Sequence, residues 1–334
     1  MPLYDTGITG SLWLARMDLT DRIERRLKLH DLRVLISVAE AGSMSKAAER
    51  LGTAQPALSR SIAELEHALR VRLLDRGPRG VEPTDYGRAL IKRGIAIFDE
   101  LRQSVKDIEF LSDPTAGELQ IGAGEAVSNG PVLEVIERLS RQYPRISIHL
   151  VTGGVEKLCD DLAARTIEMA VVRLAEPILD RQFIVENLFD DPFVIAASTR
   201  NPWARRRRIQ LAELADEPWV LLPFDTLAGA LVAAGFRASG VEPPRATVFT
   251  QSLNVRNRLL ATGRFLSALP SLRLPDRQHS LKALPLELPG TRRPVAIITL
   301  RARTLSPLAQ LFAARVRATI KPFTKAGDPS ARTR

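Results

Sequence analysis

Side chains that can read DNA bases are concentrated in the stretch "TAQPALSR", which begins at Thr53. Gln55 can form a bidentate contact with adenine and Arg60 with guanine, and the Ser59 hydroxyl can bond to a base or a phosphate. The methyl group of Ala57 can contact the methyl group of thymine. These residue types at this spacing indicate direct base recognition, provided that a folded element presents them on one edge.

Two predicted helices supply that element. The first begins near Ser43 and Ser45, which can cap it, and ends at Gly52. Pro56 stands in the first turn of a longer second helix, whose apolar residues recur every three or four positions: Leu58, Ile62, Leu65 and Leu69. An ordinary helical hairpin is the alternative, but the base-reading groups favour a helix-turn-helix, whose second helix enters the major groove with its N-terminal residues.

Arginines flank a Gly-Pro-Arg-Gly turn in "RVRLLDRGPRGVEPTDYG" (residues 70–87), which we interpret as a two-stranded wing. Arg76 and Arg79 would face phosphates or the minor groove from it. The predicted DNA-binding residues are Ser43, Lys46, Thr53, Gln55, Pro56, Ala57, Ser59, Arg60, Arg76 and Arg79.

A long helix is predicted over residues 84–111, with Thr84 as its N-cap. Its apolar residues follow a spacing close to a heptad, interrupted by Gly94: Ile91, Phe98, Leu101, Val105 and Ile108. This face could dock onto its own domain, but we favour a dimerisation seam. "SDPTAG" (residues 112–117) then ends the helix and is predicted to act as a hinge.

The segment "AEAGSMSKAAERLGTAQPALSRSIAELEHALRVRLLDR", followed by "RGVEPTDYG", closely resembles the DNA-binding domain of LysR-type transcriptional regulators over residues 29–87. The resemblance implies an all-α winged helix-turn-helix and a linker helix that forms a homodimer, with homotetramers in many members. The family often has serine or threonine just before the Gln-Pro pair, where Ala54 stands here. Residues 1–28 have no family counterpart and form an N-terminal extension, unless translation starts at Met17.

Strands and helices alternate beyond the hinge, which predicts a mostly parallel sheet with helices on both faces. Strands are expected at 118–124, 145–154, 168–174, 183–199, 218–224, 246–250, 265–270 and 293–302, and helices at 132–143, 155–165, 228–239, 253–262 and 306–320. This order resembles the two-lobed α/β effector domain of the same family, itself similar to periplasmic solute-binding proteins. The resemblance places an effector-binding domain at 118–320, with one lobe formed by 118–182 and 273–320 and the other by 183–272.

A ligand cleft is expected beyond the carboxyl ends of the strands. The candidate residues are Glu125, Ser128, Thr152, Gly153, Arg173, Thr226, Gln251 and Ser252, each of which could equally be a helix cap or, for Arg173, face solvent. Glu125 stands in a loop where the family often has serine or threonine. A carboxylate there argues against a simple carboxylate ligand and leaves sugars and amines open.

The net charge of +10 does not by itself indicate DNA binding, because the excess is +2 over residues 1–111, −1 over 112–290 and +9 over 291–334. Residues 321–334 form a basic tail. The single cysteine, Cys159, lies in a helical pattern, which predicts a buried apolar role and fits a reducing cytoplasm. No transmembrane run or secretory signal is evident. We find no catalytic motif, metal cluster or cofactor motif, so neither an enzyme nor a cofactor is expected.

The expected function is therefore that of a cytoplasmic transcriptional regulator that binds a pseudo-palindromic operator in double-stranded DNA. A small-molecule effector between the lobes would control the DNA bend and the contact with RNA polymerase. The alternative is a stand-alone solute-binding module whose N-terminal region serves only assembly. Gln55, Arg60 and the wing favour the regulator, since an assembly domain has no need of base-reading groups.

Overall fold

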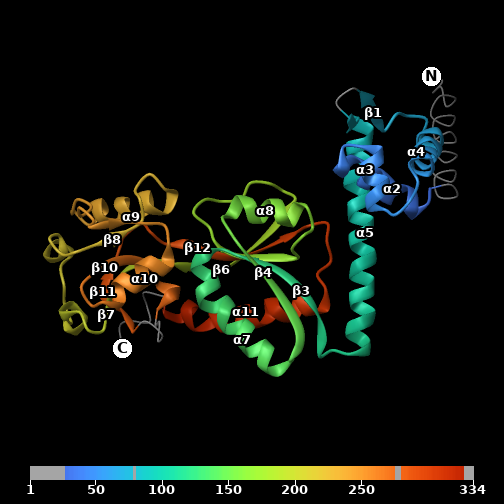
Figure 1. The fold of residues 1–334 in the computed structure, drawn as a ribbon. Coiled ribbons are helices and arrows are strands. Elements are labelled where there is room, and N and C mark those ends of the chain that lie inside the picture. The colour runs from blue at the N-terminus through green and yellow to red at the C-terminus, as the bar shows by residue number, and fades with distance from the viewer. Residues whose placement is uncertain (1–26, 78–79, 275–279, 327–334) are drawn as a thin grey trace, which may run out of the picture. The chain divides into compact units, whose positions relative to one another are not determined.

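The protein is described from a computed structural model, which covers residues 27–77, 80–274 and 280–326 (Figure 1). Its contacts divide the chain into two compact units, Met1–Arg102 and Gln103–Arg334. The boundary falls within one continuous helix, α5 (Asp85–Ser112). Across the described ranges, no helix has the length and apolar character needed to cross a bilayer.

Three helices form the core of the first unit: α2 (Leu29–Ala41), α3 (Met44–Arg50) and α4 (Gln55–Leu69). Gly42 and Gly52 both adopt φ of +61°, a left-handed conformation that favours glycine and lets the chain turn sharply after α2 and after α3. The predicted apolar face of α4 is buried, together with small residues of α3: Ala47, Ala48, Leu58, Ile62 and Leu65. The small alanines allow close helix packing, and the predicted helix-turn-helix is confirmed.

A two-stranded antiparallel wing follows, made of β1 (Leu74–Gly77) and β2 (Gly80–Pro83). The Glu66 carboxylate accepts hydrogen bonds from the backbone N–H groups of Leu73, at 2.7 Å, and Leu74, at 3.2 Å. From the other strand, the N–H of Val81 donates to the Gly42 carbonyl at 2.9 Å. The wing is thus fixed to both α4 and the turn after α2.

Helix α5 begins where the sequence predicts. The Thr84 hydroxyl accepts a hydrogen bond from the N–H of Gly87 at 3.1 Å, as an N-cap does. A Cβ atom at Gly87 would lie 2.0 Å from the Leu73 carbonyl oxygen, so only glycine fits at this crossing. At Gly94 a Cβ atom would lie 3.2 Å from the side chain of Ile36, so this half of α5 packs closely on α2.

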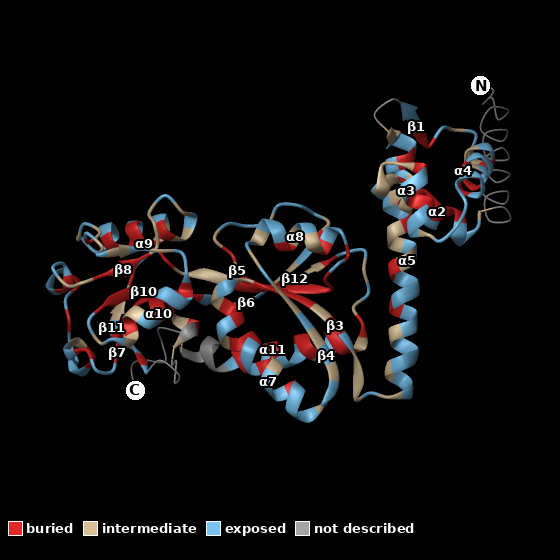
Figure 2. Cartoon of the chain, viewed as in Figure 1, coloured by how far each residue is buried: buried red, intermediate tan, exposed pale blue. Residues whose placement is uncertain are grey.

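The first lobe of the second unit contains a five-stranded sheet in the order β4-β3-β5-β12-β6. Its strands are β3 (Ala116–Ala123), β4 (Arg145–Thr152), β5 (Met169–Arg173), β6 (Phe183–Asp191) and β12 (Arg293–Leu300). Helices α7 (Leu133–Gln142) and α11 (Pro307–Ala326) cover one face and α8 (Val155–Ala163) the other (Figure 1). The buried residues concentrate in the central strands β5 and β12 (Figure 2).

The second lobe is smaller. It has an antiparallel sheet, β10-β7-β11, formed by β7 (Phe193–Ser198), β10 (Leu266–Pro270) and β11 (Leu281–Glu287). A short parallel pair, β8 (Val220–Leu221) and β9 (Val248–Phe249), joins it with α9 (Leu227–Ala238) and α10 (Leu253–Ala261). Its core surrounds Trp219, whose indole N–H donates to the Leu214 carbonyl at 2.8 Å. Short 3₁₀ helices span Pro202–Arg205, Leu211–Leu214 and Ser271–Arg273.

The structure corrects the predicted lobes at four points. The single strand expected at 183–199 is two strands, β6 and β7, which belong to different sheets and separate at Pro192. Strand β11 was not predicted, and it pairs with β7. Strand pairing therefore assigns 183–191 to the first lobe and 281–287 to the second. The first sheet is also mixed, because β12 runs antiparallel to both β5 and β6.

The predicted hinge at 112–117 does not coincide with the division between the two units, which lies earlier in α5. The Lys106 ammonium pairs with the buried Glu168 carboxylate at 2.5 Å, and the other oxygen of Glu168 accepts a hydrogen bond from the N–H of Ser306 at 3.0 Å. Arg145 pairs with Asp113 at 2.6 Å. The end of α5 and the start of the following segment are thus fastened to the first lobe.

The two ends of the predicted layout lie partly outside the described residues. Residues 1–26, which include Met17, and residues 327–334 are not described. Helix α11 extends to Ala326, so the predicted boundary between closing helix and basic tail at residue 321 falls inside a helix.

Candidate functional site

The first turn of α4 presents a polar edge. Leu58 and Ile62 face the core, whereas the predicted base-reading positions are exposed, with Ser59 half-buried: Thr53, Gln55, Pro56, Ala57 and Arg60. Pro56 lies in the first turn, where the missing N–H costs no helical hydrogen bond. The turn before α4 and the start of this helix therefore present the groups expected for base contacts to solvent.

Gln55 is positioned by a residue that the prediction left out. The Ser45 hydroxyl donates to the side-chain oxygen of Gln55 at 2.9 Å, across the turn between α3 and α4. A bidentate contact with adenine uses both the oxygen and the NH₂ group of glutamine. Ser45 would have to release the oxygen for that contact, while the NH₂ group can donate to a base without any rearrangement.

The remaining predicted DNA-binding residues flank this edge. Ser43 occupies the N-cap position of α3, but its side chain makes no capping hydrogen bond, contrary to the cap expected there. Lys46 on α3 and Arg76 on β1 are exposed. Arg79 lies outside the described residues.

The apolar stripe predicted on α5 divides into two groups. Ile91 packs against the core of its own unit, and the Arg33 guanidinium lies 4.5 Å from the centre of the Phe98 ring. Leu101, Val105 and Ile108 are 43%, 54% and 64% exposed. Two further exposed residues, Ile97 and Leu111, were missed, although they stand at helical spacing from Leu101 and Ile108.

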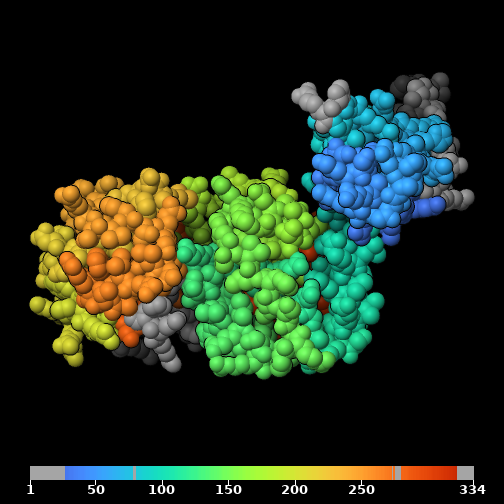
Figure 3. All heavy atoms as spheres, viewed as in Figure 1, coloured from blue at the N-terminus to red at the C-terminus, as the bar shows by residue number. Residues whose placement is uncertain are grey.

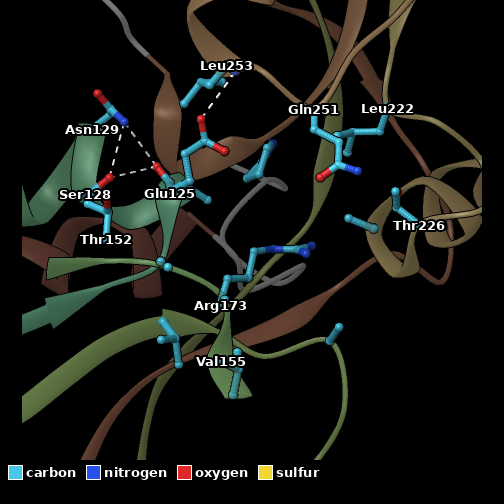
Figure 4. A pocket seen from close by; sticks show the side chains of 18 of the residues that line it. Glu125, Ser128, Asn129, Thr152, Val155, Arg173, Leu222, Thr226, Gln251 and Leu253 are labelled. Atoms are coloured by element: carbon cyan, nitrogen blue, oxygen red, sulfur yellow. Dashed lines mark hydrogen bonds between the residues drawn. The ribbon is translucent and has the colours of Figure 1, made fainter. Parts of the chain in front are cut away.

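A cleft of about 650 Å³ lies between the two lobes of the second unit. In the space-filling view, these lobes form two adjoining masses, one green and one yellow to orange (Figure 3). The cleft is lined by all the predicted effector-binding residues except Ser252: Glu125, Ser128, Thr152, Gly153, Arg173, Thr226 and Gln251. Figure 4 shows Glu125, Arg173 and Gln251 projecting into the same space from different elements.

Arg173 is held by a buried network where the chain crosses between the lobes. Its Nε atom donates to the Asp191 carboxylate at 3.1 Å, and its Nη2 atom donates to the carbonyl oxygens of Asp191 and Thr291 at 2.9 and 2.8 Å. The guanidinium also stacks on the Phe193 ring at 4.4 Å. Burial lowers the pKa of Arg173 and raises that of Asp191, against the opposing effect of their attraction. Arg173 therefore faces the protein's own carboxylate.

Glu125 bridges the two lobes. One of its carboxylate oxygens accepts a hydrogen bond from the N–H of Leu253, the first residue of α10, at 3.3 Å. Behind it, Ser128 and the side-chain NH₂ group of Asn129 both donate to the Glu125 carbonyl, at 3.0 and 3.2 Å (Figure 4). These bonds fix the turn from which the carboxylate projects.

Two of the predicted effector-binding residues act as helix caps, which was the alternative role considered for them. The Thr226 hydroxyl accepts from the N–H of Gly229 at 3.1 Å and caps α9. The Ser252 hydroxyl accepts from the N–H of Val255 at 3.4 Å and caps α10. Thr226 lines the cleft as well, whereas Ser252 does not.

Several lining residues were not predicted. Asn129 and Leu253 adjoin predicted positions, Leu222 directly follows β8, and Arg256 lies one helical turn into α10. Asp191, the partner of Arg173, stands directly before Pro192, where the sequence passes from one apolar run to the next. An acidic residue at this point in the sequence could have indicated a polar role. Arg256 carries no comparable signal, because its burial depends on the packing of α10.

Two family models match the chain. The model described as "Bacterial regulatory helix-turn-helix protein, lysR family" matches residues 29–88, and "LysR substrate binding domain" matches residues 112–321. The first covers the three-helix unit with its wing, and the second covers both lobes and the cleft.

Relatives with assigned names match along most of their length. The chain is 31% identical to the SDS degradation transcriptional activation protein of a Pseudomonas species, over 84% of this chain and 93% of that protein. It is 28% identical to the HTH-type transcriptional regulator GbpR of Azospirillum brasilense, over 89% of this chain and 87% of that protein. A full-length OxyR variant from Pseudomonas aeruginosa shares the fold, with a TM-score of 0.58 at 22% identity over 88% of this chain and 95% of that one.

Proposed function

The chain belongs to the family of LysR-type transcriptional regulators, and from this premise we propose that a small molecule in the interlobe cleft controls its action at a specific DNA site. The observation that carries the proposal is the exposed edge of α4, where Gln55 and Arg60 stand beside Ala57 at a helix N-terminus. Base-reading groups in that position suit the major groove. The cleft in the second unit suits a small ligand in size and lining.

We propose further that α5 forms the dimer through a face defined here as Ile97, Leu101, Val105, Ile108 and Leu111. Large exposed apolar residues at helical spacing along a single helix favour association with a second helix. A two-fold dimer of helix-turn-helix units would match a pseudo-palindromic operator. The same proposal includes the assembly of two dimers into a tetramer and a contact between the DNA-bound protein and RNA polymerase.

Control by the effector would act through a shift between conformations. A ligand that binds one lobe arrangement more tightly shifts the population toward it. The end of α5 is fastened to the first lobe through Lys106 and Glu168, so a change between the lobes has a mechanical path to the helix that continues toward the DNA-binding unit. In this role the protein is a regulator rather than an enzyme, it requires no cofactor, and it acts on DNA in the cytoplasm.

Genome-wide DNA capture with the purified full-length protein, run at two salt concentrations, tests the proposal. Non-specific phosphate binding falls steeply with salt, whereas base-specific recognition is retained better. We expect a pseudo-palindromic site that persists at the higher salt. Binding that is blind to sequence and disappears with salt would instead favour a solute-binding module that uses its N-terminal unit only for assembly.

A further inference from the structure

Three of the backbone N–H groups at the helix starts of the second lobe already have acceptors within the chain. Helix N-termini attract anions because their first N–H groups lack helical partners. Thr226 caps α9 through the N–H of Gly229, and Ser252 caps α10 through the N–H of Val255. The N–H of Leu253, also at the start of α10, donates to the Glu125 carboxylate of the other lobe at 3.3 Å.

The positive side chains of the cleft are engaged as well. The Nε atom of Arg173 donates its hydrogen to the Asp191 carboxylate. Its Nη2 atom donates to the backbone carbonyls of Asp191 and Thr291. A bidentate clamp on a carboxylate needs two parallel N–H groups from two nitrogens, so Arg173 cannot form one without breaking this network. Arg256, which is 5% exposed, also interacts within the chain.

One carboxylate in the cleft lining still has an oxygen for a ligand. Glu125 is exposed and is the only acidic residue among the described residues that line the cleft. One of its carboxylate oxygens accepts the N–H of Leu253, and the other does not take part in that bond. The NH₂ group of Asn129 donates to the Glu125 carbonyl and the Ser128 hydroxyl. The side-chain oxygen of Asn129 is left to accept a hydrogen bond from a ligand. An exposed carboxylate with one oxygen left for a ligand matches a ligand that brings N–H donors and positive charge.

We propose, on the basis of the regulatory function proposed above, that the cleft takes an effector carrying an ammonium or similar cationic nitrogen. Glu125 is its specificity-determining residue. The carboxylate occupies the place at the N-terminus of α10 that an anionic ligand would otherwise take, and it offers its second oxygen to the amine. The same side chain thus repels a carboxylate ligand and attracts a cationic one.

Three four-carbon probes test this with the full-length protein: 1,4-diaminobutane, butane-1,4-diol and succinate, which are cationic, neutral and anionic. Isothermal titration calorimetry is expected to show binding of the diamine in preference to the other two. Glu125→Gln keeps the shape and an acceptor oxygen but removes the charge. It should weaken diamine binding by about tenfold or more, because a charge-assisted hydrogen bond is roughly twice as strong as a neutral one.

A reciprocal variant and a control sharpen the test. Glu125→Ser frees the N–H of Leu253 and removes the negative charge, so succinate should bind more tightly than it binds the unaltered protein. Glu134→Gln removes an exposed carboxylate that pairs with Arg138 on α7, outside the cleft lining, and should leave all three affinities unchanged.

The proposal is overturned if succinate or the diol binds the unaltered protein better than the diamine, if the diamine does not bind, or if Glu125→Gln leaves its affinity unchanged. Each result leaves the capture of a specific DNA site untouched. Loss of the cationic preference with retained operator binding therefore rejects only this inference, whereas loss of specific DNA binding rejects the regulatory function.

Discussion

Arg60 lies one turn into α4 on the exposed edge, with Ala57 and Gln55 toward the helix start and the buried Ile62 on the other side. Its side chain is long enough to reach a base from there, and arginine is suited to bidentate contact with guanine. Gln55 differs from it, because its oxygen already accepts the Ser45 hydroxyl. We therefore expect Arg60 to contribute more to base discrimination than Gln55.

Arg60→Ala should weaken binding to the captured operator by about 1–3 kcal/mol and relax the preference at one base position. Fluorescence anisotropy with the operator and a scrambled duplex measures both effects. Arg138→Ala, which removes an exposed arginine of α7 in the other unit, is the matched control and should leave affinity unchanged. Unchanged operator affinity in a folded Arg60→Ala dimer would remove this residue from the interface.

Cys159 on α8 packs beside the apolar core under the first sheet. Burial raises the pKa of its thiol above the usual value, with smaller contributions from Asp160 and Asp180. A raised pKa means less of the reactive thiolate at neutral pH. Alkylation by iodoacetamide at neutral pH should be slower than for free cysteine and should rise as the pH increases. The same protein unfolded in denaturant is the control, and equally fast alkylation in both states would contradict the prediction.

At the scale of the element, α5 serves two different partners along its length. Gly94 brings its first half against Ile36, and Lys106 joins its last turns to Glu168. Between and beyond these anchors, apolar residues stay exposed on one face, from Ile97 to Leu111. A helix fixed on one side and apolar on another has the surface that a helix–helix dimer requires.

Leu101→Lys should dissociate the dimer, because it places a charge in the centre of the apolar face. Light scattering should then show the mass of one chain, while circular dichroism shows unchanged helix content. Asp107→Lys introduces the same side chain at an exposed position off this face and should leave the mass unchanged. A Leu101→Lys protein of unaltered mass would refute the dimerisation face.

At the scale of the whole molecule, the first unit and the two lobes have separate hydrophobic cores. Ile62 is fully buried in the first, and Leu139 is 1% exposed in the core of the first lobe. Units with their own cores can unfold in separate transitions. Their stabilities should then respond to core mutations independently.

Ile62→Ala should lower the free energy of unfolding of the DNA-binding unit by about 2–5 kcal/mol, through lost burial and a residual cavity. Leu139→Ala is the matched substitution in the other unit and should shift only that unit's transition. Differential scanning calorimetry of each full-length variant separates the unfolding transitions of the two units. A single transition that moves equally in both variants would show that the units unfold together.

The sequence by itself determined the elements whose signals are local. Pro56, Gly52 and the three- and four-residue apolar spacing specify the two helices of the helix-turn-helix, and Thr84 marks the start of α5. The strand-end positions also placed seven of the eight predicted effector-binding residues in the cleft lining, because parallel strands bring their carboxyl ends to one edge. These features depend on residues close together in the chain.

Tertiary structure alone decided which distant residues meet. The division of 183–199 into two strands depends on β6 pairing with β12 and β7 with β10 and β11, all far along the chain. The contacts of Arg173 with Asp191 and Thr291, and of Glu125 with Leu253, arise where the chain crosses between lobes. Local periodicity carries no information on such pairings, since strand register and burial are set by the packing of the complete sheets.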